Sequence, residues 1–140
     1  MRSVRTVACE LPAQLVLSHD VSVPMRAALR YETDDPYAVR AVFHPPGQER
    51  TVEWFFSRDM LAQALSERTG LGDVQMWPAV DAGREVVFIA LRTPTGSARL
   101  GFPAQGVRSF LSETRSAVPA GAESGRLDLD AELAQLLAGS

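Results

Sequence analysis

Few side chains in this sequence have the type and spacing that catalysis or metal binding requires. Histidine, the commonest metal ligand and a frequent general base, occurs only at His19 and His44. Cys9 is the single cysteine, and neither histidine lies at a metal-ligand spacing from it. We interpret both histidines as surface or turn residues and Cys9 as a small structural hydrophobic residue that nothing activates. The sequence therefore predicts no metal site and no cofactor site.

Two pairs of carboxylates are close enough in sequence for acid–base chemistry. Asp34 and Asp35 precede a proline, which is typical of a turn, and Asp128 and Asp130 open a helical pattern whose dipole they complement. No motif places a partner acid, base or nucleophile beside either pair. Ser57 is interpreted as a helix N-cap. The sequence also has no phosphate-binding, dinucleotide-binding or serine-hydrolase glycine motif, so we expect a protein that is not an enzyme.

Composition and charge limit the classes of partner and the compartment. The 140 residues carry 14 Lys+Arg, all of them arginine, and 17 Asp+Glu, which gives a formal net charge of −3. This acidic balance disfavours nucleic acid as a partner. A single cysteine fits a reducing compartment, and no stretch is apolar for long enough to span a membrane. We expect a cytoplasmic protein that does not insert into a membrane.

Hydrophobic patterns predict two runs of strands, each followed by a helix. The first run is a meander of four strands, at residues 4–18, 25–31, 37–43 and 51–56, and a helix follows from Ser57 to Gly70. Alternation places Met25, Ala27, Leu29 and Tyr31 on one face of the second strand, and Tyr37, Val39, Ala41 and Phe43 on one face of the third. About three strands follow, at residues 72–80, 84–92 and 97–102, and a second helix begins near Pro103, with a buried stripe of Val107, Phe110, Leu111 and Thr114. We expect an α+β fold with two antiparallel sheets, and one domain over residues 1–140 because no linker divides them.

A third helix is predicted for residues 128–138, after a loop rich in proline and glycine. Its leucines recur at helical spacing and form a narrow apolar stripe. Two interpretations are open, since the stripe either packs on the protein's own sheet or contacts another molecule. The candidate interface residues are Leu129, Leu133, Leu136 and Leu137.

Several short sequence motifs occur one after another between Val7 and Ala138. They include Leu29-Arg30-Tyr31, Asp35-Pro36-Tyr37-Ala38-Val39, Thr51-Val52-Glu53-Trp54 with Arg58-Asp59, Gly72-Asp73-Val74 with Trp77-Pro78, Val118-Pro119, and Asp128-Leu129-Asp130. Each motif is weak by itself, but their order and their distances together resemble the SsgA-like family of sporulation-specific cell division proteins in actinomycetes.

The resemblance implies a small cytoplasmic protein without catalytic residues that acts at the division septum. The sequence is most similar to the branch that helps recruit the tubulin-like division protein FtsZ, so FtsZ and other SsgA-like proteins are the expected partners. The family assembles as a trimer, and its fold resembles the Whirly-type binders of single-stranded nucleic acid. Two alternatives are open: a single-stranded nucleic-acid binder, and a paralogue that controls cell-wall remodelling during spore maturation.

Overall fold

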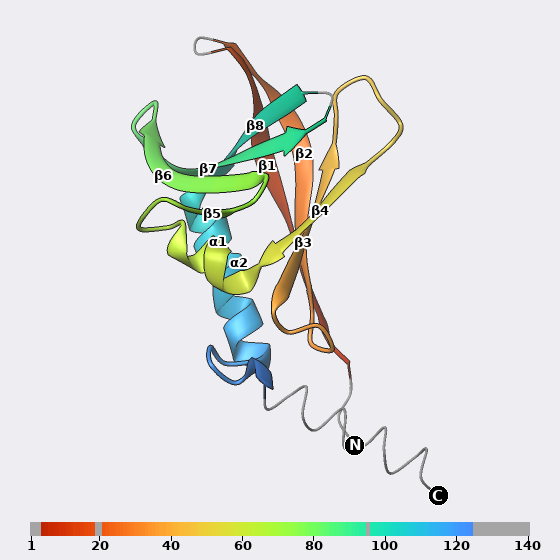
Figure 1. The fold of residues 1–140 in the computed structure, drawn as a ribbon, viewed down its shortest axis with the longest axis vertical. Coiled ribbons are helices and arrows are strands. Elements are labelled where there is room, and N and C mark those ends of the chain that lie inside the picture. The colour runs from red at the N-terminus through yellow and green to blue at the C-terminus, as the bar shows by residue number, and fades with distance from the viewer. Residues whose placement is uncertain (1–3, 19–20, 95, 125–140) are drawn as a thin grey trace, which may run out of the picture.

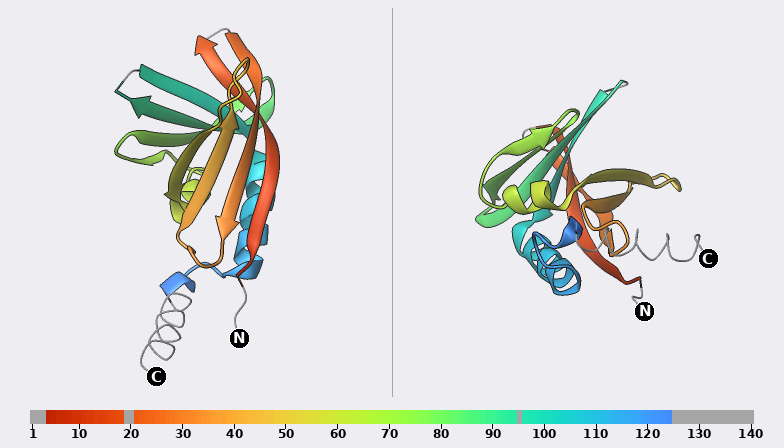
Figure 2. Two further views of the ribbon diagram at one scale, coloured as in Figure 1. Left: turned by 90° about the vertical axis from the view of Figure 1, so that its right-hand side faces the viewer. Right: turned by 60° about the horizontal axis from the view of Figure 1, so that its bottom comes forward.

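The computed structural model describes residues 4–18, 21–94 and 96–124, and Figure 1 shows their arrangement. In chain order the strands and helices are β1 (Thr6–Ser18), β2 (Val21–Glu32), β3 (Ala38–His44), β4 (Val52–Ser57), α1 (Arg58–Gln63), β5 (Thr69–Leu71), β6 (Val74–Asp81), β7 (Arg84–Thr93), β8 (Gly96–Pro103) and α2 (Ala104–Ala117). All these strands belong to one antiparallel sheet, in the order β4-β3-β2-β1-β8-β7-β6-β5. Figure 2 shows that the sheet is strongly curved.

The α+β class, with one helix after each half of the sheet, is confirmed, but the two halves do not form separate sheets. β1 pairs with β2 from Thr6 to Ser18, and its residues 14–16 also pair with β8 on the other side. The second half contributes four strands, because the short β5 adds to the three that the sequence predicts. Alternation along a strand shows which side chains are buried but does not identify the neighbouring strand. For this reason the pattern does not reveal that β1 joins the two halves.

Alternate residues of the strands face the helices and form the core. On β2 the predicted buried face is confirmed, with at most 5% exposure for each of Met25, Ala27, Leu29 and Tyr31. On β3 the predicted face includes Val39 and Phe43 but not Tyr37, which is 45% exposed. Tyr37 lies in the turn before β3, where the alternation of the strand has not yet begun.

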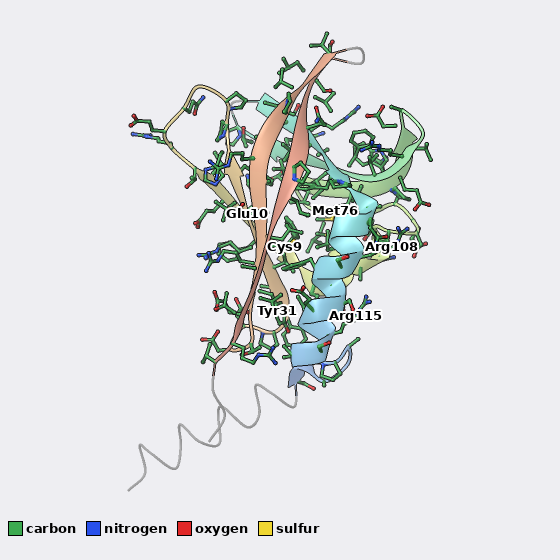
Figure 3. The ribbon with its side chains drawn as sticks, turned by 180° about the vertical axis from the view of Figure 1, so that it is seen from behind. Cys9, Glu10, Tyr31, Met76, Arg108 and Arg115 are labelled. Carbon is green, nitrogen blue, oxygen red and sulfur yellow. The ribbon has the colours of Figure 1, made fainter. Side chains whose placement is uncertain are left out.

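Helix α2 lies along β1 and covers the core, as Figure 3 shows from behind. It begins after Pro103, as predicted, and its predicted stripe of Val107, Phe110, Leu111 and Thr114 is fully buried. Gly106 lets the helix approach the sheet, because a Cβ atom there would lie 2.5 Å from Cδ2 of Leu11 on β1. A helix glycine normally weakens a helix, so its presence here reflects this close contact.

Helix α1 starts where the sequence predicts but ends early. The Ser57 hydroxyl accepts a hydrogen bond from the backbone N–H of Met60 at 2.8 Å, which confirms the N-cap. The helix ends at Gln63 rather than near Gly70, which lies in β5 and pairs with Gln75 of β6. Strand pairing competes for these residues, and tertiary context overrides the helical spacing of the sequence.

Candidate interaction surfaces

Cys9 lies on β1 beside α2 and packs against the core, as Figure 3 shows. Burial raises the pKa of its thiol, and the negative charge of Glu113 raises it further. A raised pKa keeps the thiol protonated at neutral pH, whereas a nucleophile needs the thiolate. This environment favours the structural interpretation of Cys9.

The other residues considered for catalysis are not brought together. His44 ends β3 opposite Arg26, and His19 lies outside the described residues. Asp34 and Asp35 are exposed in the predicted turn, where the Asp35 N–H donates to the Glu32 carbonyl oxygen at 3.0 Å. In the part of the chain that the structure describes, no cluster of His, Cys, Asp or Glu could hold a metal ion.

The candidate interface leucines, together with Asp128 and Asp130, fall outside the described residues, which end at position 124. Their role as an interface therefore stays a prediction. Within residues 4–18, 21–94 and 96–124, no helix combines the length and the apolar character needed to cross a membrane.

Arg58 is the first residue of α1, but its side chain turns into the core and is only 2% exposed. Its guanidinium carbon lies 5.0 Å from the centre of the Tyr31 ring. The guanidinium donates hydrogen bonds to the carbonyl oxygens of Thr114 and Val118, at 3.2 and 2.6 Å. These carbonyls stand at the C-terminal end of α2, where the helix dipole favours a cation. The Thr114 carbonyl oxygen also accepts a hydrogen bond from the Val118 N–H at 2.8 Å.

The same guanidinium donates a hydrogen bond to the carboxylate of Glu123. This hydrogen bond lowers the pKa of Glu123, although burial of the carboxyl acts in the opposite direction. The contact holds the segment after α2 against the start of α1. From the sequence, Arg58 is only expected to lie at the start of a helix. No spacing rule connects it to Glu123, which lies 65 positions further along the chain.

The outer face of the first half of the sheet is polar and rich in arginine. Arg30 lies directly opposite Arg40, and Arg40 lies opposite Phe55, which is 60% exposed. Arg40 is 3.9 Å from the carboxylate of Glu53, and the Nε atom of Arg30 has no hydrogen-bond partner within the described structure. Like charges on directly opposite positions destabilise a sheet. The facing pair of Arg30 and Arg40 therefore does not by itself stabilise the sheet.

The outer face of the second half carries an aromatic pair. Trp77 of β6 lies opposite Phe88 of β7, and their ring centres are 5.8 Å apart. The guanidinium groups of Arg68 and Arg99 both lie over the Trp77 ring. The Trp77 side chain points away from the helices and is half buried. The alternation of Val74 and Met76, which are buried, is the signal that places Trp77 on the outer face.

Comparison with known proteins identifies the family. Residues 25–123 match the family model described as SsgA, a Streptomyces sporulation and cell division protein. The chain belongs to the SsgA family. The resemblance found in the sequence motifs is thereby confirmed.

Curated relatives in the SsgA family match over almost the whole chain. The sporulation-specific cell division protein SsgB of Streptomyces coelicolor is 53% identical over 135 residues, covering 96% of this chain and 98% of the relative. SsgB of Thermobifida fusca is 42% identical over 132 residues, covering 94% of this chain and 95% of the relative. Both of these relatives are named SsgB.

Solved structures in the family have the same fold. A structure from work on SsgB mutations that correlate with longitudinal cell division in Streptomyces coelicolor matches with a TM-score of 0.86 at 50% identity, covering 90% of this chain and 98% of the other. The SsgA-like protein of Thermobifida fusca matches with a TM-score of 0.87 at 42% identity, covering 96% and 98%. The α+β fold is therefore shared with SsgB proteins.

Proposed function

We propose that this chain is a non-catalytic adaptor in sporulation-specific cell division that helps recruit or position FtsZ at the septum. The observation that carries the proposal is the 53% identity, over nearly the full length of both chains, to a protein named sporulation-specific cell division protein SsgB. Identity at this level over matched lengths supports a common role. Within this proposal, direct contact with FtsZ is more specific than the cell-division role, and it rests on the resemblance to SsgB.

The chemistry of the described residues supports an adaptor better than an enzyme. The thiol of Cys9 has a raised pKa, and the carboxylate with a lowered pKa, Glu123, is engaged by Arg58 in holding two segments together. An open groove of about 440 Å³ on the outer face of β1 and β2 is lined by Pro12, Arg26 and His44 among others, and Arg26 lies 4.0 Å from Glu10. Exposed Phe55 and half-buried Trp77 are residues suited to protein contacts.

A sedimentation assay tests direct contact with FtsZ. Purified chain is mixed with FtsZ polymers in GTP, and co-pelleting is expected to saturate with the amount of polymer. A fluorescent fusion tests the cellular role in a Streptomyces coelicolor strain that lacks its own SsgB, where septa and septal fluorescence should return. Restored septa without co-pelleting would separate the cell-division role from the FtsZ contact, and failure of both would reject the proposal.

Cell-wall remodelling is the second cellular role that the family resemblance leaves open. Co-precipitation from sporulating cells distinguishes it from septum formation. Recovery of septal proteins supports the adaptor proposal, whereas recovery of cell-wall hydrolases without septal proteins would favour the remodelling role.

We also propose, from the family resemblance, that the chain assembles as a trimer. Light scattering on the purified protein measures its mass directly. A mass of three chains that is independent of dilution supports this proposal, and a monomer at micromolar concentration would reject it.

A further inference from the structure

The outer face of the second half of the sheet holds an aromatic platform. Trp77, Phe88 and Gly101 lie directly opposite one another on β6, β7 and β8, which are adjacent in Figure 1. A Cβ atom on Gly101 would come within 3.2 Å of the Phe88 ring, so this ring lies over the glycine. The Trp77 and Phe88 rings are tilted by 36° at a centre distance of 5.8 Å. The Phe88 ring thus packs between Gly101 and the Trp77 ring.

Two arginines from separate elements converge on this platform. The guanidinium carbon of Arg68, from the segment between α1 and β5, lies 4.7 Å from the centre of the Trp77 ring. That of Arg99, from β8, lies 5.3 Å from the same centre. Both arginines are exposed. The Trp77 ring is therefore contacted by two solvent-accessible positive charges.

The charges at this site are not neutralised by the described part of the chain. Arg58 and Arg108 are each paired with a glutamate, at Glu123 and Glu85. Within the residues that the structure describes, Arg68 and Arg99 have no carboxylate partner and no hydrogen bond from their guanidinium groups. Two unpaired cations over one ring are notable in a chain whose formal net charge is −3.

Stacking determines what these arginines can still bind. A guanidinium that stacks on an aromatic ring uses its face, so the N–H groups at its edge stay available for a planar anion. Carboxylates fit this edge with two parallel hydrogen bonds. A ligand with two carboxylates could pair with both cations. The geometry therefore favours a ligand with two acidic groups and an apolar part that contacts the rings.

We propose that Arg68, Arg99, Trp77 and Phe88 form a docking site for a short acidic peptide segment of a partner protein, with carboxylates on the arginines and an apolar side chain on the rings. This site deepens the adaptor function and rests on it, because it supplies a contact for a division protein. A peptide fits the observations better than nucleic acid does. Single-stranded nucleic acid requires a basic groove that follows several phosphates, whereas this platform offers two arginines on an acidic protein.

Fluorescence anisotropy on the full chain tests the site. The probe is a labelled 12-residue peptide that alternates Asp or Glu with Leu and Phe. Its matched control has Asn and Gln at the acidic positions, and a labelled single-stranded oligonucleotide is measured in parallel. The acidic peptide should bind in the micromolar range and weaken with added salt, and the amide peptide should bind at least about tenfold more weakly.

Variants distinguish this site from general charge attraction. The double variant Arg68→Gln/Arg99→Gln should weaken peptide binding at least about tenfold. The control Arg50→Gln/Arg84→Gln removes the same charge from other exposed positions and should change affinity less than about twofold. Thermal unfolding by circular dichroism checks that both variants fold. Because Trp77 and Trp54 are the two tryptophans, a Trp54→Phe background makes peptide-induced quenching a direct signal from Trp77.

Three binding results would overturn the proposal. These are no binding of the acidic peptide to the wild-type chain, equal weakening in both double variants, and tighter binding of the oligonucleotide than of the peptide. The last result would assign the platform to single-stranded nucleic acid. In cells, normal septal fluorescence of the Arg68→Gln/Arg99→Gln variant would also reject this inference and leave the adaptor function intact. Peptide binding by a wild-type chain that gives no septal fluorescence would reject the adaptor function only.

Discussion

Arg58 and Glu123 form a buried ion pair across 65 positions of sequence. Their side chains are 3% and 6% exposed, and the same guanidinium binds carbonyls at the end of α2. One arginine thus connects the start of α1 to the end of α2 and to the segment that follows it. Removing one partner of such a pair leaves the other charge without compensation.

Replacement of Glu123 by alanine should lower the free energy of unfolding by about 1–3 kcal/mol, because Arg58 would keep its buried charge but lose its carboxylate. The matched control is Glu85→Ala, which breaks the exposed pair between Glu85 and Arg108 at 3.1 Å. This control should cost at most about 1 kcal/mol. Urea denaturation followed by circular dichroism measures both values. Equal losses in the two variants would contradict the distinction between the buried pair and the exposed pair.

Acid should weaken the Arg58–Glu123 pair in a defined direction. The pKa of Glu123 is lowered from its ordinary value of 4.5, with the hydrogen bond from Arg58 as the main cause. A carboxyl group with a lower pKa in the folded state stabilises the protein above its unfolded pKa, and this stabilisation is lost as pH falls through the folded pKa. The difference in unfolding free energy between wild type and Glu123→Gln should have its largest value at neutral pH and should decrease below pH 4.5.

The measurement is a set of urea titrations from neutral to acid pH, with Glu85→Gln as the control whose difference from wild type stays small throughout. A Glu123→Gln difference that is constant with pH, or that grows in acid, would show that the carboxylate does not contribute through its charge.

The effects of substitutions at Gly106 and Leu11 on the free energy of unfolding should be strongly non-additive. Gly106→Ala places a Cβ atom 2.5 Å from Cδ2 of Leu11, so the substitution should destabilise the wild-type protein by about 1–3 kcal/mol through overpacking. In a Leu11→Ala background the space is free, and the same substitution should instead stabilise the helix by up to about 1 kcal/mol. A double-mutant cycle by urea denaturation measures the coupling. Additive effects would mean that α2 does not depend on this close approach.

Deletion of residues 128–140 tests the candidate interface at Leu129, Leu133, Leu136 and Leu137. If the leucine stripe joins molecules, the deletion should reduce the mass measured by light scattering while circular dichroism stays that of a folded sheet. A milder variant, Leu133→Gln/Leu136→Gln, keeps the chain length and should act in the same direction. Substitution of Asp128 and Asp130 by asparagine is the control and should leave the mass unchanged. An unchanged oligomer with an intact fold in all variants would reject the interface.

The sequence predicts structure well where the residues of a single strand or helix are sufficient to form it. Alternation predicted the buried face of β2 from Met25 to Tyr31, and helical spacing predicted the buried stripe of α2. The Ser57 cap depends on a hydroxyl and an N–H three residues apart, so it is visible in the sequence. The end of α1 was missed, because pairing of Thr69 with Met76 decides it.

The sequence by itself determined the α+β class, most strand positions and the family, since periodicity and ordered motifs are local properties of the chain. Only the tertiary structure decided that β1 joins β8, that Arg58 meets Glu123, and that Arg68 and Arg99 converge on Trp77. Each of these contacts joins segments that are distant along the chain. Their formation depends on which strands become neighbours and on how the curved sheet closes around its helices, and no local pattern records either choice.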